Sequence, residues 1–205
     1  MKILRLASLF GAVALMAAAC LPVTTKTPVG TTVGLAADPA LVGTWRVVPK
    51  KDAAATDEEG PGYLHFVLDG GGHLTALAIS PGKPTDKGTG HGSWSVFAAT
   101  AAALGSRHYL NVHETFEDGK QAKLDDMQNI PLLYTIDDGT LTLYLIDEKA
   151  AKAAIAAGRI DGTVESGDFG DVVLTASADK LDAFLATDEG AGLFTEKLIV
   201  AERVE

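Results

Sequence analysis

Five histidines lie between positions 65 and 113, and histidine is both a common metal ligand and a frequent general base. Their spacing opposes the simplest metal sites, because His108 and His113 stand an odd number of positions apart and would point to opposite faces of a strand. A site built from His73, His91 and His108 requires three strand ends to converge at one rim. We therefore expect ordinary surface histidines, with no metal and no cofactor.

Two Ser-x-x-Lys patterns could supply a nucleophile and its base, as in penicillin-interacting enzymes. Ser177 with Lys180 is explained more simply as a helix cap and first turn, while Ser80 and Lys83 enclose Pro and Gly. The sequence contains no companion motif, no nucleophile elbow and no phosphate loop. We interpret the acidic stretch 161–171 as a solvated loop rather than a weak calcium site. We expect no enzyme and no catalytic residue.

Cys20 is the only cysteine, and it directly follows a 14-residue apolar stretch from Leu6 to Ala19. Lys2 and Arg5 precede this stretch. A basic start, an apolar run and small residues at the cut site are typical of an export signal. The run is shorter than the roughly 20 residues that span a bilayer core. We expect cleavage before Cys20.

A cysteine at the first position after the cut resembles the lipobox of bacterial lipoproteins, in which the thiol is acylated, as with palmitate. The resemblance implies that residues 1–19 are a lipoprotein signal peptide and that Cys20 anchors the protein to a membrane. Plain secretion and an uncleaved anchor are the alternatives. Leu21 stands where enterobacterial lipoproteins retained at the inner membrane have aspartate. The resemblance therefore implies a cell-envelope address at the outer membrane, facing the periplasm.

Without residues 1–19 the chain has 15 basic and 27 acidic residues, a net charge of −12. Such a surface disfavours nucleic acid and anionic lipid headgroups as partners, because both would be repelled. With Cys20 acylated, no disulfide can form, so packing alone must stabilise the fold.

Residues 20–39 are rich in Thr, Pro, Gly and Val without a helical or strand period, so we expect a flexible lipid-anchored tether. Residues 40–205 form the folded domain. Short runs broken by turn residues are typical of antiparallel β structure. The expected strands are 41–48, 63–69, 73–79, 92–99, 107–117, 130–136, 140–146, 171–175 and 196–204.

A hairpin is predicted around Gly70-Gly71. A two-residue loop would set Leu64 opposite Leu77. The buried face of the hairpin would hold Leu64, Phe66, Leu68, Leu77 and Ile79.

On strand 107–117, His108 and Glu114 share a face with two apolar residues, Leu110 and Val112. The two polar residues lie ~20 Å apart at ~3.3 Å per residue, so one or both should lie near a rim of the barrel.

Two short helices are predicted before the last strands, one capped by Asp147 and stopped by Gly158, the other capped by Ser177. Eight to ten antiparallel strands are best accommodated in a closed or nearly closed barrel, which leaves little exposed edge. The fold class expected is mainly β: an antiparallel barrel with these two helices inserted.

Gly43-Thr44-Trp45, early in the first strand, resembles the Gly-x-Trp signature of the lipocalin and calycin barrels. The resemblance implies that Trp45 packs across the closed end of the barrel, beneath an arginine from the last strand region, for which Arg203 is the candidate. In that family a helix follows the last strand, whereas here both predicted helices precede it. We therefore expect a lipocalin-like barrel rather than a true lipocalin.

Two classes of function remain possible from the sequence. An enzyme would be a third class, but no catalytic motif supports it. The first is a non-catalytic binding module that holds a small apolar molecule, as the family resemblance implies. The second is an interaction or assembly protein with a filled core, which docks an envelope protein through its acidic surface or the loop 80–92. Candidate ligand-lining residues are Trp45, Leu64, Phe66, Leu77, His108, Leu110, Val112, Leu141 and Leu143.

Overall fold

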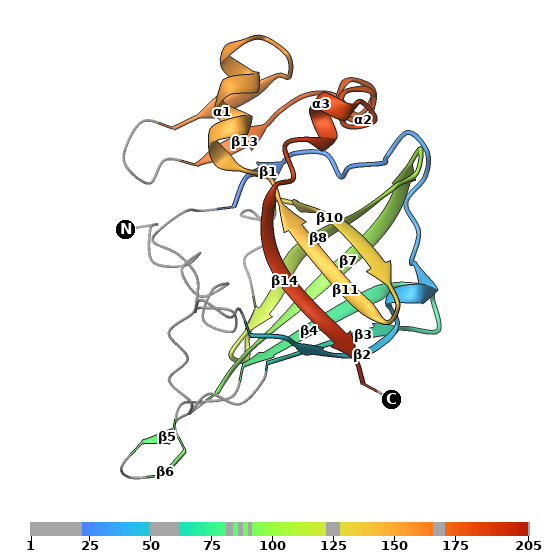
Figure 1. Ribbon diagram of the computed structural model, residues 1–205, viewed down its shortest axis with the longest axis vertical. Helices are drawn as coiled ribbons and strands as arrows, with labels where there is room; N and C mark the ends of the chain where they lie inside the picture. The colour runs from blue at the N-terminus through green and yellow to red at the C-terminus, as the bar shows by residue number, and fades with distance from the viewer. Residues whose placement is uncertain are drawn as a thin grey trace.

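The computed structural model describes residues 22–49, 62–80, 84–85, 88–89, 92–121, 128–165 and 171–204. Its main body is a closed antiparallel barrel of eight strands, each paired with the next barrel strand along the chain, with the last paired to the first (Figure 1). This confirms the predicted fold class. The barrel strands are β2 (Gly43–Val47), β3 (Tyr63–Leu68), β4 (Leu74–Ser80), β7 (Ser93–Leu104), β8 (Arg107–Glu117), β10 (Ile130–Asp137), β11 (Thr140–Leu145) and β14 (Glu196–Arg203).

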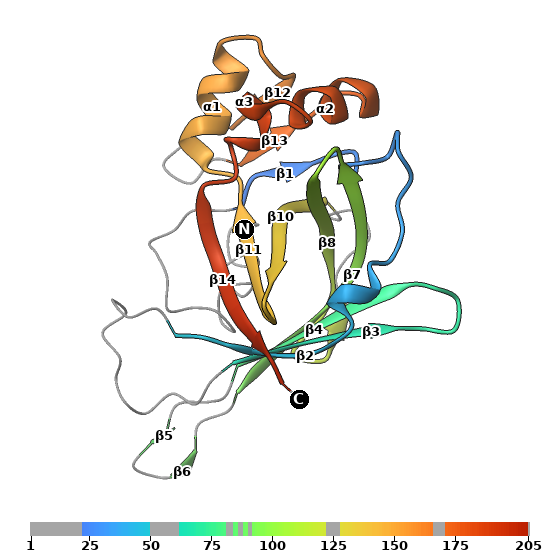
Figure 2. The ribbon, with the colours of Figure 1, turned by 45° about the vertical axis from the view of Figure 1, so that its right-hand side comes forward.

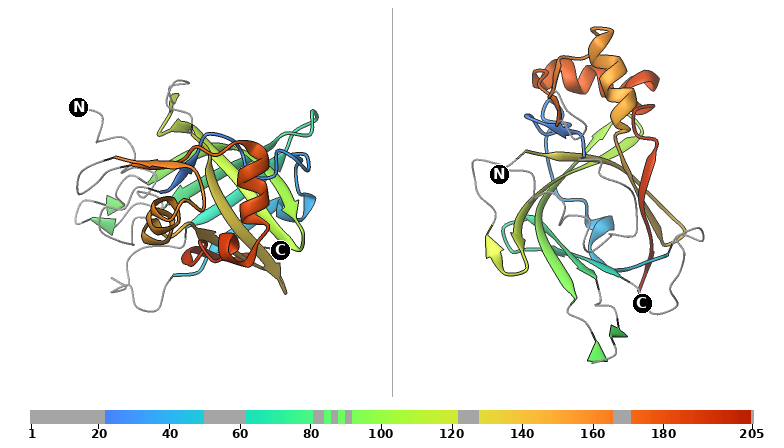
Figure 3. Two further views of the ribbon diagram at one scale, coloured as in Figure 1. Left: turned by 90° about the horizontal axis from the view of Figure 1, so that it is seen from above. Right: turned by 90° about the vertical axis from the view of Figure 1, so that its left-hand side faces the viewer.

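Alternating side chains fill the barrel because successive residues of a strand point to opposite faces. In β11, Leu141, Leu143 and Leu145 are buried, while the alternating residues Thr140, Thr142 and Tyr144 are half-buried. The strands curve around this common interior (Figure 3). Two small additions complete the β structure: β9 (Lys120–Gln121) extends the sheet beside β8, and β5 (Pro84–Thr85) pairs with β6 (Gly88–Thr89).

An insert between the seventh and eighth barrel strands holds all the described α-helices, gathered at one end of the molecule (Figure 2). Asp147 caps the first by accepting a bond from the Ala150 amide at 2.7 Å, and Gly158 follows its end with a φ of +66°. The predicted helices are confirmed, and the structure adds a third of four residues. The insert contains α1 (Glu148–Ala156), β12 (Gly162–Val164), β13 (Val172–Leu174), α2 (Ala178–Leu185) and α3 (Asp188–Ala191).

The predicted strand 171–175 lies outside the barrel. β13 instead forms the centre of a separate three-stranded sheet, between β12 and the N-terminal strand β1 (Thr24–Thr25). All three residues of β13 are buried, which explains their continuous apolar run. A second hydrophobic core forms between the insert and outward-facing barrel residues such as Leu104 and Tyr109.

Tyr109 shows how tightly the insert covers the barrel wall. Its side chain is fully buried, packs edge-on against Phe194 with ring centroids 5.4 Å apart, and donates to the Leu185 carbonyl at 2.9 Å. Burial raises the pKa of Tyr109 to about 12. The phenol therefore acts as a neutral donor that joins β8 to α2.

The prediction of a flexible tether over residues 20–39 is wrong from Pro22 onward. Val23, Thr25 and Val29 are buried, and β1 runs parallel to β13. Two buried polar side chains bind this segment. Asn111 accepts from the Val29 amide at 2.7 Å and donates to its carbonyl at 2.9 Å. Asp182 accepts from Gly30 and from Thr32.

The first hairpin differs from its predicted register by one residue. Its turn spans three residues, because the Asp69 amide bonds to the His73 carbonyl, and Leu64 therefore pairs with Ala78 instead of Leu77. A one-residue slip moves a whole strand's side chains to the other face. Thus Leu77 and Ile79 face outward, while Leu74, Ala76 and Ala78 face the core. Leu68, predicted to be buried, is exposed at the strand end.

Candidate ligand-binding site

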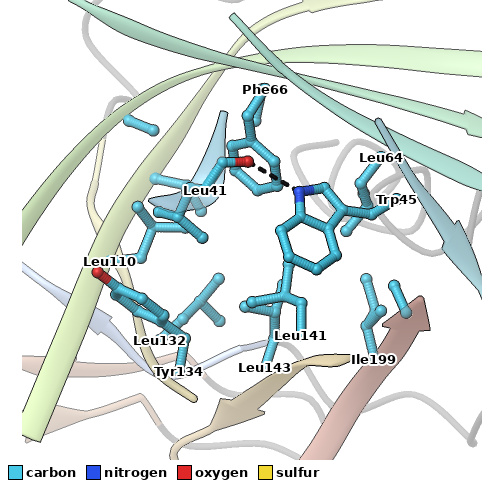
Figure 4. Packing of buried hydrophobic residues seen from close by; sticks show 14 of the residues in the cluster. Leu41, Trp45, Leu64, Phe66, Leu110, Leu132, Tyr134, Leu141, Leu143 and Ile199 are labelled. Atoms are coloured by element: carbon cyan, nitrogen blue, oxygen red, sulfur yellow. Dashed lines mark hydrogen bonds between the residues drawn. The ribbon is translucent and has the colours of Figure 1, made fainter. Parts of the chain in front are cut away.

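One end of the barrel is closed by Trp45, which is fully buried. Its indole nitrogen donates to the Leu41 carbonyl at 2.8 Å, so the 3₁₀ helix η1 (Pro39–Leu41) is fastened across this end (Figure 4). The guanidinium of Arg203 lies over the outer side of the Trp45 ring. The contact implied by the Gly-x-Trp resemblance is therefore present in the structure.

Most of the predicted lining residues do face the barrel interior. Figure 4 shows aromatic and aliphatic side chains from β2, β3, β8, β10, β11, β14 and η1 pointing toward one another. Leu77 is the first exception, because of the register difference described above. His108 is the second: it lies exposed at the rim, its ring 5.6 Å from that of Tyr134. The inward-facing residues are Trp45, Leu64, Phe66, Leu110, Val112, Leu141 and Leu143.

The side chains that face the barrel interior differ in size around its circumference. Four inward positions on β4 and β7 carry alanine, beside the larger Leu74 and Phe97, whereas the facing strands supply Trp45, Tyr134 and several leucines. Large residues opposite small ones can interdigitate and fill a small barrel, and small residues can also leave room beside them. We call the small residues the alanine wall: Ala76, Ala78, Ala99 and Ala101.

A half-buried carboxylate lies on the inner face at the far end, where β7 begins and β8 ends. Glu114 pairs with Phe97, and both follow the inward alternation of their strands. Its Oε1 is buried and has no hydrogen-bond partner among the described residues. An ionised oxygen in such a position is costly unless a donor reaches it. This end can therefore accept a hydrogen bond from a ligand.

Electrostatics at this carboxylate favour its protonated form. Burial raises the pKa of Glu114 above its usual 4.5, and the negative charges of Glu117 and Asp118 raise it further. The Ser95 hydroxyl opposes the shift by hydrogen bonding to the carboxylate. Burial likewise raises the pKa of Glu117. The far end is thus an acidic rim above an apolar interior.

Sequence reasoning found this site only in part. It placed Glu114 on the face of Leu110 and Val112, which the structure confirms. It missed Ser95 and Phe97, although alternation along β7 puts both on the face of Ala99. The extra residue of the bulge is Thr115 on β8, so alternation fails on β8 beyond Glu114 while it continues along β7.

Two of the described histidines make ordinary structural contacts. His65 Nδ1 lies 2.7 Å from the Thr44 hydroxyl, and His73 Nδ1 lies 3.0 Å from the Asp69 carboxylate at the hairpin turn. His91 falls outside the described residues. Within the described ranges no group of three or more potential metal ligands comes together.

The serine–lysine patterns can be placed only in part. Lys180 pairs with Asp161 at 2.9 Å, and the Ser177 side chain makes no capping bond, although Ser177 does precede α2. Lys83 and most of the loop 80–92 fall outside the described residues, as does much of the acidic stretch 161–171.

A shallow groove of about 340 Å³ lies on the surface between the N-terminal segment and α2. Its charged members are Asp179 and Asp182, and Asp182 already bonds to Gly30 and Thr32. The groove is lined by Thr32, Val33, Leu104, Gly105, Asp179, Asp182, Ala183 and Ala186.

Among the helices that the structure describes, none is long and apolar enough to cross a membrane. Comparison with protein-family models, with curated proteins and with solved structures finds no match for this chain.

Proposed function

We propose that this protein is a lipid-anchored, non-catalytic binding module of the cell envelope that takes a small apolar molecule into the far end of its barrel. The observation that carries the proposal is the orphaned, buried Oε1 of Glu114 at the end of an otherwise apolar interior. Buried polar groups without partners mark functional positions more often than random ones.

The chemistry of the lining suggests the class of ligand. An apolar body would lie along the alanine wall, opposite the leucines of β11. One hydroxyl or amine on the ligand would donate to Glu114, within reach of Ser95. Acidic neighbours favour a neutral or cationic ligand over an anion.

The test is native mass spectrometry of residues 20–205 carrying Cys20→Ser, exported behind a cleavable signal and purified without detergent. Residues 22–36 must be kept, because they are part of the fold. A stoichiometric extra mass that leaves on denaturation is the expected result. Ala99→Leu should abolish it by filling the interior, while Ala98→Leu, on the outer face, should retain it. A bare mass in wild type and both variants would contradict the proposal.

The second candidate is an envelope interaction protein with a filled barrel. The specific observation in its favour is the cluster of 19 buried residues that contact one another inside the barrel. The stability of Ala99→Leu separates the two candidates. In a filled core the added methylenes would cost about 1–3 kcal/mol of unfolding free energy, whereas a ligand-sized space would accept them at little cost.

The proposed anchor rests on Cys20 and the export signal before it. Acylation predicts lipid mass on the N-terminal peptide of the mature protein. Cys20→Ser should move the folded domain from the washed membrane fraction into the soluble fraction. Retention of the variant in washed membranes would contradict the anchor.

A further inference from the structure

Six apolar residues form an exposed surface on the outer face of β3, β4, β7 and β8, here called the aromatic wall. Its largest members are substantially exposed: Tyr63 36%, Ile79 40%, Trp94 39% and Phe116 40%. Leu77 and Val96, half-buried between them, complete the wall.

Strand pairing makes these residues contiguous. Tyr63, Ile79 and Trp94 are direct partners across three strands. Leu77, Val96 and Phe116 are partners in the neighbouring row. Directly paired side chains stand within about 5.5 Å of each other. The two rows therefore make one continuous apolar surface rather than scattered residues.

Elsewhere on the outer face of the barrel, other parts of the chain cover outward-facing residues. Outward residues farther along β7 and β8, such as Leu104 and Tyr109, are covered by the insert, and Asn111 is covered by the N-terminal segment. The helices lie at the opposite end of the molecule from β3 and β4 (Figure 2). A contiguous exposed apolar surface on a domain whose residues 20–205 carry a net charge of −12 marks an interaction site.

The start of the described chain lies at the insert end of the barrel, because β1 pairs with β13, and strand pairing bounds its distance from the wall. Thr25 bridges to Asn129, which adjoins the pairing of Ile130 with Val112, and β8 in turn pairs with β7. Strand spacings of ~4.8 Å and rises of ~3.3 Å place Thr25 within about 25 Å of Trp94. Cys20 precedes Thr25 by five residues, a reach of at most ~17 Å.

We propose that the aromatic wall rests on the surface of the bilayer that holds the Cys20 anchor, so that the two contacts together fix the orientation of the barrel. The inference rests on the proposed anchor. Tryptophan and tyrosine rings favour the membrane interface, and the neighbouring aliphatic side chains gain by leaving water. The six residues carry no charge, and the acidic chain favours zwitterionic over anionic headgroups. The aromatic wall alone binds the bilayer only weakly and reversibly, because its side chains lie flat on the bilayer surface and none of its six residues is basic.

Trp94 provides a direct test, because the chain has two tryptophans and Trp45 is fully buried. Residues 20–205 with Cys20→Ser are titrated with phosphatidylcholine vesicles, with and without brominated acyl chains. The expected result is a blue shift of the emission and its quenching by bromine at millimolar lipid. Trp94→Phe should remove both effects and leave the Trp45 emission unchanged.

A second pair of variants measures the contribution of the wall. Ile79→Ser with Phe116→Ser should weaken vesicle partitioning at least tenfold, without loss of the fold because both residues are exposed. Val164→Ser, at a site 44% exposed on β12, is the matched control and should leave partitioning unchanged.

The outcomes separate this inference from the proposed anchor. Acyl mass on wild-type Cys20 without any vesicle effect on Trp94 would overturn the membrane contact and leave the anchor standing. Vesicle binding without acylation would support the contact and contradict the anchor. A blue shift that grows with protein concentration in the absence of lipid would assign the wall to a second copy of the chain. Protection of Trp94 by envelope proteins, but not by their extracted lipids, would assign it to a protein partner.

Discussion

The guanidinium carbon of Arg203 lies 4.3 Å from the centroid of the Trp45 ring. Its Nη1 donates to the Val42 carbonyl at 2.9 Å, and Nη2 donates to the Ala40 carbonyl. Gly43 leaves room for this arrangement: its φ is +129°, and a Cβ there would lie 3.0 Å from Arg203 Nη1. The last strand thereby fastens the first strand and η1 at the closed end.

Replacement of this arginine should weaken the closed end. We expect Arg203→Ala to lower the free energy of unfolding by about 1.5–4 kcal/mol, from a cation–π contact of about 0.5–1 kcal/mol and two hydrogen bonds of about 0.5–1.5 kcal/mol each. Urea unfolding followed by circular dichroism measures the loss. Arg46→Ala, which removes only a half-exposed ion pair with Glu202, is the control and should cost about 0–1 kcal/mol. Equal losses for the two variants would contradict the role assigned to Arg203.

The binding of the N-terminal segment depends on Asp182, which is almost fully buried. Asp182→Asn replaces an acceptor by a donor that faces the Thr32 amide, so we expect a loss of about 1.5–3 kcal/mol. Amide hydrogen exchange at Gly30 and Thr32 should accelerate in parallel. Asp179→Asn, exposed on the same helix, should change stability by less than about 1 kcal/mol. A free tether would show no effect of Asp182→Asn on either measurement.

Glu114 predicts a pH dependence with a definite sign. Its pKa is raised in the folded state, so the folded protein holds the proton over a pH range in which the unfolded chain has released it. Stability should therefore fall as the pH rises from the usual value of about 4.5 through the folded pKa. Glu114→Gln should remove this decline. Its stability relative to wild type should be lowest near pH 4 and increase toward neutrality.

Urea unfolding at several pH values between 4 and 8 checks this prediction. Glu196→Gln, at an exposed position on β14, is the matched control. If the stability of Glu114→Gln relative to wild type stays constant with pH, or falls toward neutrality, the carboxyl is not buried as described.

Neighbouring residues of β4 test the hairpin register. Ala78→Asp would place an unpaired carboxylate in the core beside Leu64 and should cost several kcal/mol. Leu77→Asp, on the outer face, should cost about 1 kcal/mol or less. Soluble yield and urea unfolding measure both variants. A two-residue turn would reverse the order, so the comparison separates the two registers directly.

Local alternation predicted most of the barrel from the sequence. The runs around β8 and β11 have hydrophobic residues at alternate positions, and their buried faces, with Leu110, Val112, Leu141 and Leu143, were assigned correctly. The buried face of β4 in the hairpin with β3 was assigned incorrectly, because the glycine-rich turn 70–72 allows loops of two or three residues. Nothing local distinguishes these loops, and the choice is made by which face the whole barrel buries.

The sequence by itself predicted the barrel class and the Asp147 helix cap, because both depend on short-range periodicity or on a few residues at close spacing. The position of Trp45 under Arg203 followed from the resemblance of Gly43-Thr44-Trp45 to a known motif. Only the tertiary structure decided that residues 22–36 belong to the fold. That segment has no period of its own, since its backbone bonds to side chains 82 and about 150 positions away, in Asn111 and Asp182. The aromatic wall also required the tertiary structure, because its six residues come from four strands that only the closed sheet brings side by side.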